Sequence, residues 1–569
     1  MISKYKKHFP YFVFIVAALL LGFSPVIFSI YRFHDDLFFW RLPFSTKEFP
    51  MICSLTLFVG RIIGAIIEWF DFVIVRTVID LNIIRLLNSL VIAFCAIGAY
   101  GFLVKYLKRP MDAALSTVIL FSLPAFEVWS FHVGQSYEVY ALIFVMIALY
   151  AVNEVPLEGS IWKRVIGKRG LVSILSLVIS NLIYPPLTAF YWAMALVLIL
   201  VEMENDQKEL RKKIENIYIP GITAILIFAF IYKFRKCFIN IFFINSYQPD
   251  ALTTNYYDKF LWFFQTVIPQ TLNLWNIFPN NFLPVFIVLF FAGALILMLI
   301  KEFKNGNNKN LWADLILRFL IVSSLIILTY WPNLLCVVNF NPYRCGAGLA
   351  AIIVILLIGA LRTYSQLFQK FSHFSVTLIL CLVCLWGIVR CFDNIDRFRV
   401  KLSAVEYSFL KNSMNNFHGN LKEIYLIPAT FDDFYSYYDE FGVSTFGFNT
   451  YSHVVDLINA MLVDIEAENN MKWVGLERFA SPEELKYGIS SPNSYNSTFK
   501  YYFKEESADV KPHYQTFELK IVLGEKPKLK LQDSTLLIDM NNLYGPFKQI
   551  MGKFYNFKII NKGSWDGKE

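Results

Sequence analysis

Two adjacent carboxylates, Asp35 and Asp36, follow an apolar run over residues 10–30 and lie in the aromatic-rich stretch "YRFHDDLFFW". A carboxylate at the edge of a membrane can take a proton from a hydroxyl group, or it can hold a divalent metal together with phosphate groups. A charge that only flanks the end of a helix is the alternative. The pairing of the two residues, with His34 beside them, favours a chemical role.

Four cations lie where apolar stretches end or are interrupted. Arg61 interrupts "CSLTLFVGRIIGAIIEWFDF", and Arg344 lies in "NPYRCG". Arginine binds phosphate through a planar fork of donors, so both residues are suited to the headgroup of a phosphate-bearing lipid. Lys233 and Arg235, in "KFRK", offer a second cationic site of this kind. For Arg61, a side chain that only snorkels to the headgroup level is the alternative.

Further polar residues gather between two apolar runs, in "PAFEVWSFHVGQSYEVYAL". Glu127 lies within an apolar run, where a carboxylate is costly unless it is paired or functional. His132, Gln135 and Glu138 follow shortly after it. Together with the cations and the aspartate pair, these residues predict a mixed acidic and basic cavity that faces outward beside the bilayer.

The elements that must position these residues are membrane helices. The 569-residue chain is 56% hydrophobic and 17% charged, and its mean hydropathy is +0.48. Soluble domains are about one-quarter charged, and apolar runs of ~20 residues can span a bilayer. We therefore predict a mainly α, polytopic transmembrane bundle of about eleven helices. The expected spans are residues 10–30, 83–104, 112–131, 138–152, 171–184, 186–202, 217–233, 281–300, 314–338, 346–362 and 374–392.

The chain divides into two parts that differ in charge. Residues 1–392 carry a net charge of +12, whereas residues 393–569 carry a net charge of −4. This division fits a membrane domain followed by a soluble domain. In the second part, "EIYLIPATF" and "STLLIDMNNL" predict strands and "TYSHVVDLINAMLVDIEAE" predicts a helix, so we expect a C-terminal soluble α/β domain.

Several function classes are excluded by motifs that the sequence lacks. The second part, residues 393–569, has no glycine-rich phosphate loop, no zinc-ligand spacing and no nucleophile elbow. All eight cysteines precede residue 393, which excludes a disulfide framework in the second domain. A basic surface interleaved with aromatic residues, which nucleic acid would require, is also missing. Nucleic acid is therefore not an expected partner.

Loop charge predicts the orientation in the membrane, because cytoplasmic loops carry an excess of lysine and arginine. With a cytoplasmic amino terminus, the alternate loops "KYLKRP", "WKRVIGKRG", "KELRKK" and "KEFKNGNNK" are all basic. This register requires a hairpin of two short helices at "NLIYPPLTAF", whereas a single kinked span would break it. The aspartate pair, residues 131–140, residues 339–346 and the whole second domain then face outward.

This combination of groups suits one chemical problem, the transfer of a sugar from a lipid phosphate to a hydroxyl group outside the membrane. The reaction needs a base for the hydroxyl group and cations for the departing phosphate. It also needs a hydrophobic groove for the lipid chain. It needs no nucleotide-binding fold, and the sequence contains no motif of one.

The chain resembles the GT-C type glycosyltransferases, and in particular the type II serotype-converting O-antigen glucosyltransferases. The resemblance covers residues 10–390 as a pattern. It is carried by Asp35-Asp36 after the first helix, Gly60-Arg61 in "VGRIIGAII", the motif "GQSYEVYAL", Tyr184 in "SNLIYPPLTAFYW" and Arg344 in "NPYRCG". Pro185 follows the tyrosine where that family usually has glutamine.

The resemblance implies a transferase that moves glucose or another hexose from a polyprenyl-phosphate-linked donor to a lipid-linked surface polysaccharide such as O-antigen. The expected location is the bacterial inner membrane, with catalysis on its periplasmic face. Asp35 or Asp36 would be the general base, and the other would orient the acceptor. Arg61 and Arg344 would bind the donor phosphate. The residues expected to contact the sugar or the acceptor are His34, Glu127, His132, Gln135, Glu138 and Tyr184.

The sequence establishes no cofactor; if a divalent metal takes part, Asp35 and Asp36 are its expected ligands. Two other functions compete with the transferase. One is a transporter or flippase for lipid-linked saccharides, although the sequence has no clear internal repeat and its candidate charges lie at the membrane boundary. The other is a polymerase or assembly protein whose second domain binds the glycan.

Overall fold

In the computed structural model, the described residues form two compact units, one up to Ile395 and one from Asp396 onward. The residues that the structure describes are 2–28, 56–57, 60–74, 78–133, 136–156, 158–203, 207–242, 253–272, 274, 282–304, 311–337, 339, 343–367, 373–415, 423–427, 471–479, 498–505, 518–521, 535–539, 542, 545–546 and 549. All of the helices up to residue 395 belong to the first unit.

The first unit is built from helices. Its amino-terminal half contains α1 (Ile2–Phe28), α4 (Ile62–Ile74), α5 (Val78–Leu107), α6 (Pro110–Phe121), α7 (Pro124–Phe131), α8 (Tyr137–Asn153), α9 (Ile161–Ile166), α10 (Lys168–Ile183), α11 (Pro185–Thr188) and α12 (Phe190–Met203). Its second half contains α13 (Gln207–Phe242), α14 (Tyr256–Trp262), η2 (Phe263–Val267), α15 (Ile268–Leu272), α16 (Phe282–Lys304), α17 (Leu311–Leu328), α18 (Trp331–Leu335), η4 (Tyr343–Gly346), α19 (Ala347–Leu367) and α20 (His373–Ile395).

In the part of the chain that the structure describes, six helices are long and apolar enough to cross a membrane, or seven if α6 and α7 form one broken span. The six are Lys6–Phe28, Leu81–Leu107, Pro185–Met203, Glu209–Phe234, Tyr343–Gln366 and His373–Ser413. Three shorter apolar helices accompany them, Tyr137–Asn153, Pro284–Leu297 and Ile316–Leu328. The chain is therefore a mainly α-helical membrane protein.

The first unit exposes apolar side chains and buries charged ones. Phe94 of α5 and Leu226 and Phe230 of α13 are each 64% exposed, whereas Arg85 and Glu127 are completely buried. In water this arrangement would be unfavourable, because apolar surface costs about 25 cal/mol per Å² to expose. In lipid the cost disappears, since the lipid tails are as apolar as the exposed side chains. The exposed apolar surface therefore faces lipid.

The stretch 112–131, expected as one straight span, is broken into α6 and α7, whose axes differ in direction by 64°. Helix α6 ends at Phe121, and Pro124 is the first residue of α7. Proline fits the first turn of a helix, where its missing N–H would have no partner, but it cannot continue a helix from the preceding turn. The segment is thus a broken span or a re-entrant loop.

A second break lies at Tyr184, where the sequence predicted two short helices rather than one. Helix α10 ends at Ile183, and Tyr184 is extended with φ −157° and ψ 99° before Pro185 begins α11. A residue that precedes proline is sterically pushed away from helical torsion angles. The tyrosine side chain is consequently held at a helix boundary.

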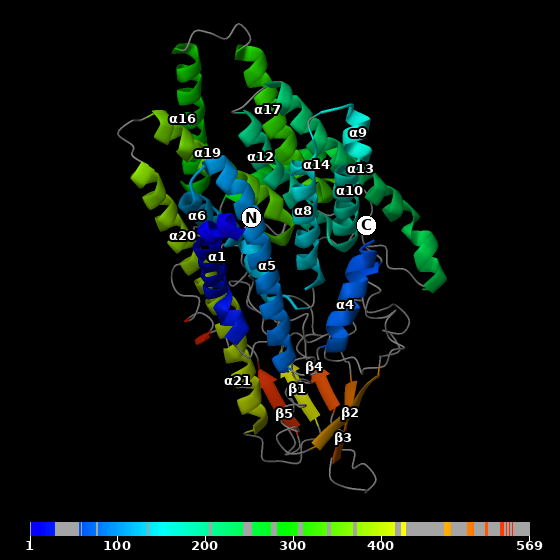
Figure 1. Cartoon of the computed structure of the whole chain (residues 1–569). Coiled ribbons are helices and arrows are strands. Elements are labelled where there is room, and N and C mark those ends of the chain that lie inside the picture. The colour runs from blue at the N-terminus through cyan, green and yellow to red at the C-terminus, as the bar shows by residue number, and fades with distance from the viewer. Residues whose placement is uncertain are drawn as a thin grey trace. The chain divides into compact units, whose positions relative to one another are not determined.

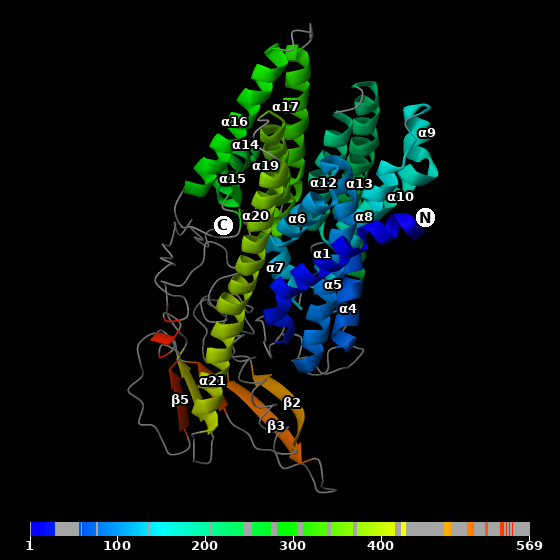
Figure 2. The same cartoon turned by 60° about the vertical axis from the view of Figure 1, so that its left-hand side comes forward.

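Helix α5 lies at the centre of the first unit and packs against α1, α6, α7, α8 and α12. Figure 1 shows α1, α5 and α8 side by side, and Figure 2 shows α1 crossing α5. Helix α8 also packs against α10, and α12 packs against α19. The ends of the broken helices meet within this frame, because α4 contacts α8 and α10 while η4 contacts α7 and α11.

The second unit contains two small sheets beside the helices η5 (Asp396–Lys401) and α21 (Leu402–Asn415). Its strands are β1 (Glu423–Ile427), β2 (Met471–Phe479), β3 (Thr498–Glu505), β4 (Glu518–Ile521) and β5 (Thr535–Asp539). Strands β4, β1 and β5 form a parallel sheet in that order, and β2 pairs with β3 in antiparallel fashion. The two predicted strands contain β1 and β5, and the predicted helix at 450–468 lies outside the described residues.

Replacing Gly348 of α19 with alanine is expected to lower the melting temperature of the detergent-purified protein. The added Cβ would lie 3.0 Å from the carbonyl oxygens of both Ala189 and Thr329, and backbone atoms cannot rotate away as a side chain can. Overpacking of this kind typically costs about 1–3 kcal/mol. Gly98→Ala is the matched control, because its Cβ would make an ordinary contact, 3.5 Å from Met146 Sδ. Equal melting temperatures for the two variants would contradict the close packing of α19.

Candidate functional site

A tight turn places Arg61 immediately before α4. Gly60 has φ +79°, a conformation that glycine adopts without steric cost. The Gly60 N–H donates to the Leu57 carbonyl at 2.9 Å, and the Arg61 N–H donates to the Thr56 carbonyl at 3.0 Å. The Arg61 carbonyl in turn accepts from the Ala65 N–H, at 2.9 Å, at the start of the helix. The "GR" pair of the sequence is therefore a turn that presents an arginine.

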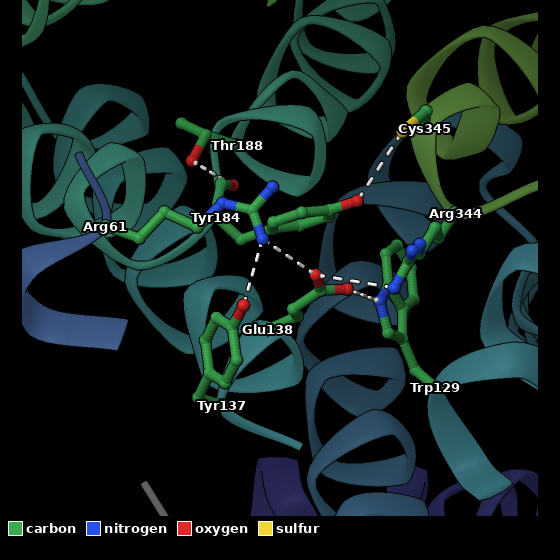
Figure 3. Close-up of polar contacts among 8 residues, drawn as sticks. All are labelled: Arg61, Trp129, Tyr137, Glu138, Tyr184, Thr188, Arg344 and Cys345. Atoms are coloured by element: carbon green, nitrogen blue, oxygen red, sulfur yellow. Dashed lines mark hydrogen bonds and ion pairs between the residues drawn. The ribbon is translucent and has the colours of Figure 1, made fainter. Parts of the chain in front are cut away.

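The carboxylate of Glu138 is the point at which three other segments converge (Figure 3). Glu138 lies in the first turn of α8 and is 1% exposed. Its Oε1 lies 3.2 Å from Nη1 of Arg61 and 3.7 Å from Nη1 of Arg344. Its Oε2 accepts a hydrogen bond from the indole N–H of Trp129 at 3.0 Å. One buried carboxylate thus joins two arginines that are distant in the sequence.

Two tyrosines complete the environment of Arg61. Its Nη1 donates to the hydroxyl oxygen of Tyr137 at 2.9 Å, and its guanidinium carbon lies 4.5 Å from the ring centroid of Tyr184. Stacking on an aromatic face stabilises a guanidinium group that has lost part of its water. The Tyr184 hydroxyl group is 3.6 Å from Sγ of Cys345, next to Arg344. These six residues, Arg61, Trp129, Tyr137, Glu138, Tyr184 and Arg344, form what we call the arginine–glutamate cluster.

Arg344 is presented by the short helix η4, just before α19 begins. The side-chain amide of Asn333 donates to the Cys345 carbonyl at 3.3 Å, which ties η4 to α18. All of the cluster residues consequently come from helix ends or from the turns between helices. Side chains at such positions can approach one another from several directions, as side chains on the sides of parallel helices cannot.

Helix α4 adds two more carboxylates beside the cluster. Glu68 is buried and hydrogen-bonded to Thr56, and burial raises the pKa of Glu68 to about 8. Asp71 accepts a hydrogen bond from the hydroxyl group of Ser136, and burial raises the pKa of Asp71 to about 6 despite that bond. The charges of Arg61 and Glu138 both act on Glu68. Acidic groups with raised pKa values in a buried polar cluster are typical of functional sites.

Glu127 belongs to a different cluster, in which α7 contacts α20. Its Oε2 accepts from the side-chain amide of Asn394 at 3.1 Å, and both of its oxygens are within reach of that amide. Arg390 forms an ion pair with Asp393 at 3.2 Å on the same helix. Among the described contacts, the carboxylate of Glu127 therefore pairs with Asn394 of α20 and not with a residue of the arginine–glutamate cluster.

The remaining predicted residues do not join the arginine–glutamate cluster among the contacts that the structure describes. His132 is buried at the end of α7, where its ring packs on Phe131 and its carbonyl accepts from Asn88. Lys233 is exposed on α13. His34, Asp35, Asp36, Gln135 and the side chain of Arg235 lie outside the described residues.

Sequence reasoning missed Trp129, Tyr137 and Asp71. A signal for each was nevertheless present, since a buried indole N–H needs an acceptor and Tyr137 is adjacent to Glu138. Asp71 lies ten residues after Arg61, in the same apolar stretch. What could not be read is the partner of each group, because the partners come from other helices. No group of three or more His, Cys, Asp or Glu residues suited to a metal ion occurs within the described ranges.

Replacing Glu138 with glutamine is expected to lower the melting temperature more than any exposed charge change does. Arg61 and Arg344 would lose their shared counter-charge, and breaking a buried ion pair by removing one partner costs on the order of 3–5 kcal/mol. Glu154→Gln is the matched control, because Glu154 pairs with Arg169 at 3.3 Å on the exposed surface. Thermal unfolding of both variants in the same detergent measures the difference. A Glu138→Gln variant as stable as the control would show that the pairing carries no stability.

Comparison with known proteins assigns no family to this chain. No family model, no curated protein and no solved structure matches it. The resemblance to GT-C glycosyltransferases therefore stays an expectation from the sequence motifs. The function must accordingly be inferred from the residues of the arginine–glutamate cluster and their surroundings.

Proposed function

We propose that the chain is an integral-membrane glycosyltransferase of GT-C type, which moves a hexose from a polyprenyl-phosphate-linked donor to a lipid-linked surface polysaccharide such as O-antigen. One observation carries the proposal. Arg61 and Arg344, each chosen from the sequence as a phosphate-binding residue, meet at the single buried carboxylate of Glu138. Two guanidinium groups that share one carboxylate retain a positive charge between them, which suits a phosphate group.

The geometry supports a phosphate rather than a neutral ligand. Arginine forks match the oxygens of a phosphate, and charge-assisted hydrogen bonds of this type are about twice as strong as neutral ones. The developing charge on the departing lipid phosphate is what such cations stabilise during transfer. Glu138 and Tyr184, both expected from the sequence to contact the sugar or the acceptor, lie in the same cluster. Lys233 and Arg235 are a second proposed cationic contact, on α13.

The predicted topology supports an outward-facing site. Loop charge predicts that residues 131–140 and 339–346, which contain Glu138 and Arg344, face outward. The same alternation of spans puts the segments of Arg61 and Tyr184 on that side. The four side chains meet in one cluster, which is compatible with that prediction. We accordingly propose about eleven spans by the ~20-residue criterion, a cytoplasmic amino terminus, and a periplasmic α/β domain over residues 393–569 in the bacterial inner membrane.

In the proposed reaction, Asp35 or Asp36 removes the proton from the acceptor hydroxyl group. The hydroxyl oxygen forms a bond to C1 of the sugar while the bond from C1 to the donor phosphate oxygen breaks. The electron pair of that bond leaves with the lipid phosphate, whose added negative charge Arg61 and Arg344 stabilise. The second aspartate orients the acceptor, or both hold a divalent metal if one takes part.

A flippase for lipid-linked saccharides is the competing function, and the buried Glu127–Asn394 pair is the observation that favours it. Ionisable residues inside a bundle often mark the pathway of a transported substrate. Transfer of sugar by purified protein in detergent distinguishes the two functions, because a flippase changes only the side of the membrane on which its substrate lies.

Replacing Asp35 and Asp36 separately with asparagine is expected to reduce sugar transfer by about 10²–10⁴ in whichever variant loses the base. Mass spectrometry of the surface polysaccharide measures the modification, and immunoblotting of membranes controls for protein level. Asp258→Asn is the control, since Asp258 is exposed in the first turn of α14, where its carboxylate accepts a hydrogen bond from the side-chain amide of the capping Asn255. Full activity in both variants would show that the pair only flanks the end of a helix and takes no part in catalysis.

Arg61→Gln and Arg344→Gln are each expected to weaken the binding of polyprenyl phosphate by about tenfold or more, because each removes a charge-assisted hydrogen bond to the phosphate. Binding is followed as the ligand-induced rise in melting temperature, which grows with the ratio of ligand concentration to Kd. Arg169→Gln is the control, as Arg169 pairs with Glu154 away from the cluster. Unchanged binding in both cluster variants would contradict the proposed phosphate site.

A further inference from the structure

The carboxylates around Arg61 outnumber the nearby cations if all of them are ionised. Arg61 and Arg344 supply two positive charges, whereas Glu138, Glu68 and Asp71 supply up to three negative ones. If these five side chains together carried a net negative charge, they would repel a phosphate. Anion binding therefore requires at least one of the three acids to be neutral. The question is which acid holds the proton, and the surroundings of Glu68 answer it.

Of the three carboxyl groups, only that of Glu68 has a buried oxygen without a hydrogen-bond partner among the described residues. Glu138 has two arginines and an indole N–H, and Asp71 accepts from Ser136. Glu68 is 93% buried, and its Oε2 has no hydrogen-bond partner among the described residues, so that Thr56 must bond to its other oxygen. The hydrogen bonds described for the Arg61 guanidinium go to Tyr137 and Glu138.

The charged and titratable groups that act on Glu68 come from its own helix, from the turn before it and from α8. Arg61 lies in the turn before α4 and Asp71 lies on α4, whereas Tyr137 and Glu138 act on it from the start of α8. Burial is the largest influence and favours the neutral acid, and Asp71 and Glu138 reinforce it by repulsion. Thr56 and Arg61 oppose it without overcoming it, and the pKa of Glu68 is raised to about 8. Helix α10 approaches the same helix through its backbone, at the Ile183 carbonyl near Gly64.

We propose that Glu68 is protonated when the site binds its ligand, and that its carboxylic O–H is a third donor for a phosphate oxygen, beside Arg61 and Arg344. This rests on the proposed function and names a residue that neither the motifs nor the resemblance assigns. A neutral carboxylic acid donates a hydrogen bond that a carboxylate cannot donate. Its proton also prevents the surrounding side chains from having a net negative charge, which would repel an anion.

Loss of this proton weakens the site in a defined pH range. Above pH 8, ionised Glu68 would face the phosphate as a like charge, and a group with a pKa near 8 is only about one-tenth protonated at pH 9. The ratio of Kd for the wild type to Kd for Glu68→Gln should therefore be near 1 at pH 6.5 and about 10 at pH 9. Glutamine keeps a donor at this position and cannot ionise. The ratio also cancels the titration of the ligand's own phosphate.

Binding is measured on full-length protein in nanodiscs with polyprenyl phosphate as the probe, and in parallel with inorganic phosphate. A ratio that rises for polyprenyl phosphate alone supports the donor role with a lipid headgroup as ligand; a rise for both supports it with free phosphate also accepted. A ratio that stays constant with pH overturns the proposal. A Glu68→Gln variant that binds tenfold more weakly at pH 6.5 also overturns it, because Glu68 would then act in its ionised form.

Thermal unfolding separates failure of this inference from failure of the proposed function. An acid whose pKa is raised in the folded state stabilises the fold fully below its unfolded pKa and loses that contribution as pH rises through its folded pKa. The melting temperature of Glu68→Gln minus that of the wild type should therefore widen between pH 5 and pH 8 and then level off. Glu154→Gln, on the exposed surface, should show no such change.

The two readouts together leave no ambiguous outcome. A widening gap without any phosphate binding means that Glu68 is neutral in a protein that does not bind the proposed donor, so that the donor role and the proposed function fall together. Binding of polyprenyl phosphate without a widening gap keeps the proposed function and overturns the neutral state of Glu68.

Discussion

The cost of removing charge from water is the constraint on which the rest of this structure depends. Glu138 is almost completely buried, in a unit whose outer surface faces lipid, and an isolated carboxylate there would be prohibitively expensive. Arg61, Arg344 and the indole of Trp129 make it tolerable by surrounding both of its oxygens. Because those partners come from three different segments, their arrangement ties α4, α7, α8 and η4 into one unit around a single carboxylate.

Breaks in the helices are what allow this convergence. Pro124 starts α7 after a 64° bend, Pro185 forces Tyr184 out of the helix, and Gly60 turns the chain into α4. A continuous helix satisfies its own backbone in lipid but presents side chains only along its flanks. Interrupted helices expose polar side chains at their ends, and the polar groups of the interrupted backbone are covered by neighbouring protein. The same devices therefore build the fold and the site.

The cluster combines opposing electrostatic demands. As the proposed phosphate site, it must hold enough negative charge to keep two arginines in place without a ligand, yet retain enough positive charge to attract a phosphate. A carboxyl group whose pKa lies near neutral pH, such as that of Glu68, can meet both demands. Its charge is set by its surroundings rather than by its residue type alone. Asp71, held by Ser136, tolerates its charge better and accordingly has a pKa closer to its ordinary range.

The sequence alone determined the class of protein, most of the helices and the residue types of the site, because hydrophobic run length and proline position act locally. Arg61, Glu138 and Arg344 could be chosen as charges that interrupt or follow apolar runs, and Tyr184 through the family resemblance, whereas the bend at Pro124 was not anticipated. Only the tertiary structure decided that these four meet while Glu127 pairs with Asn394 on α20, and that Trp129 and Tyr137 join them. Such contacts depend on how distant helix ends pack together, and no periodicity within one segment encodes the position of another.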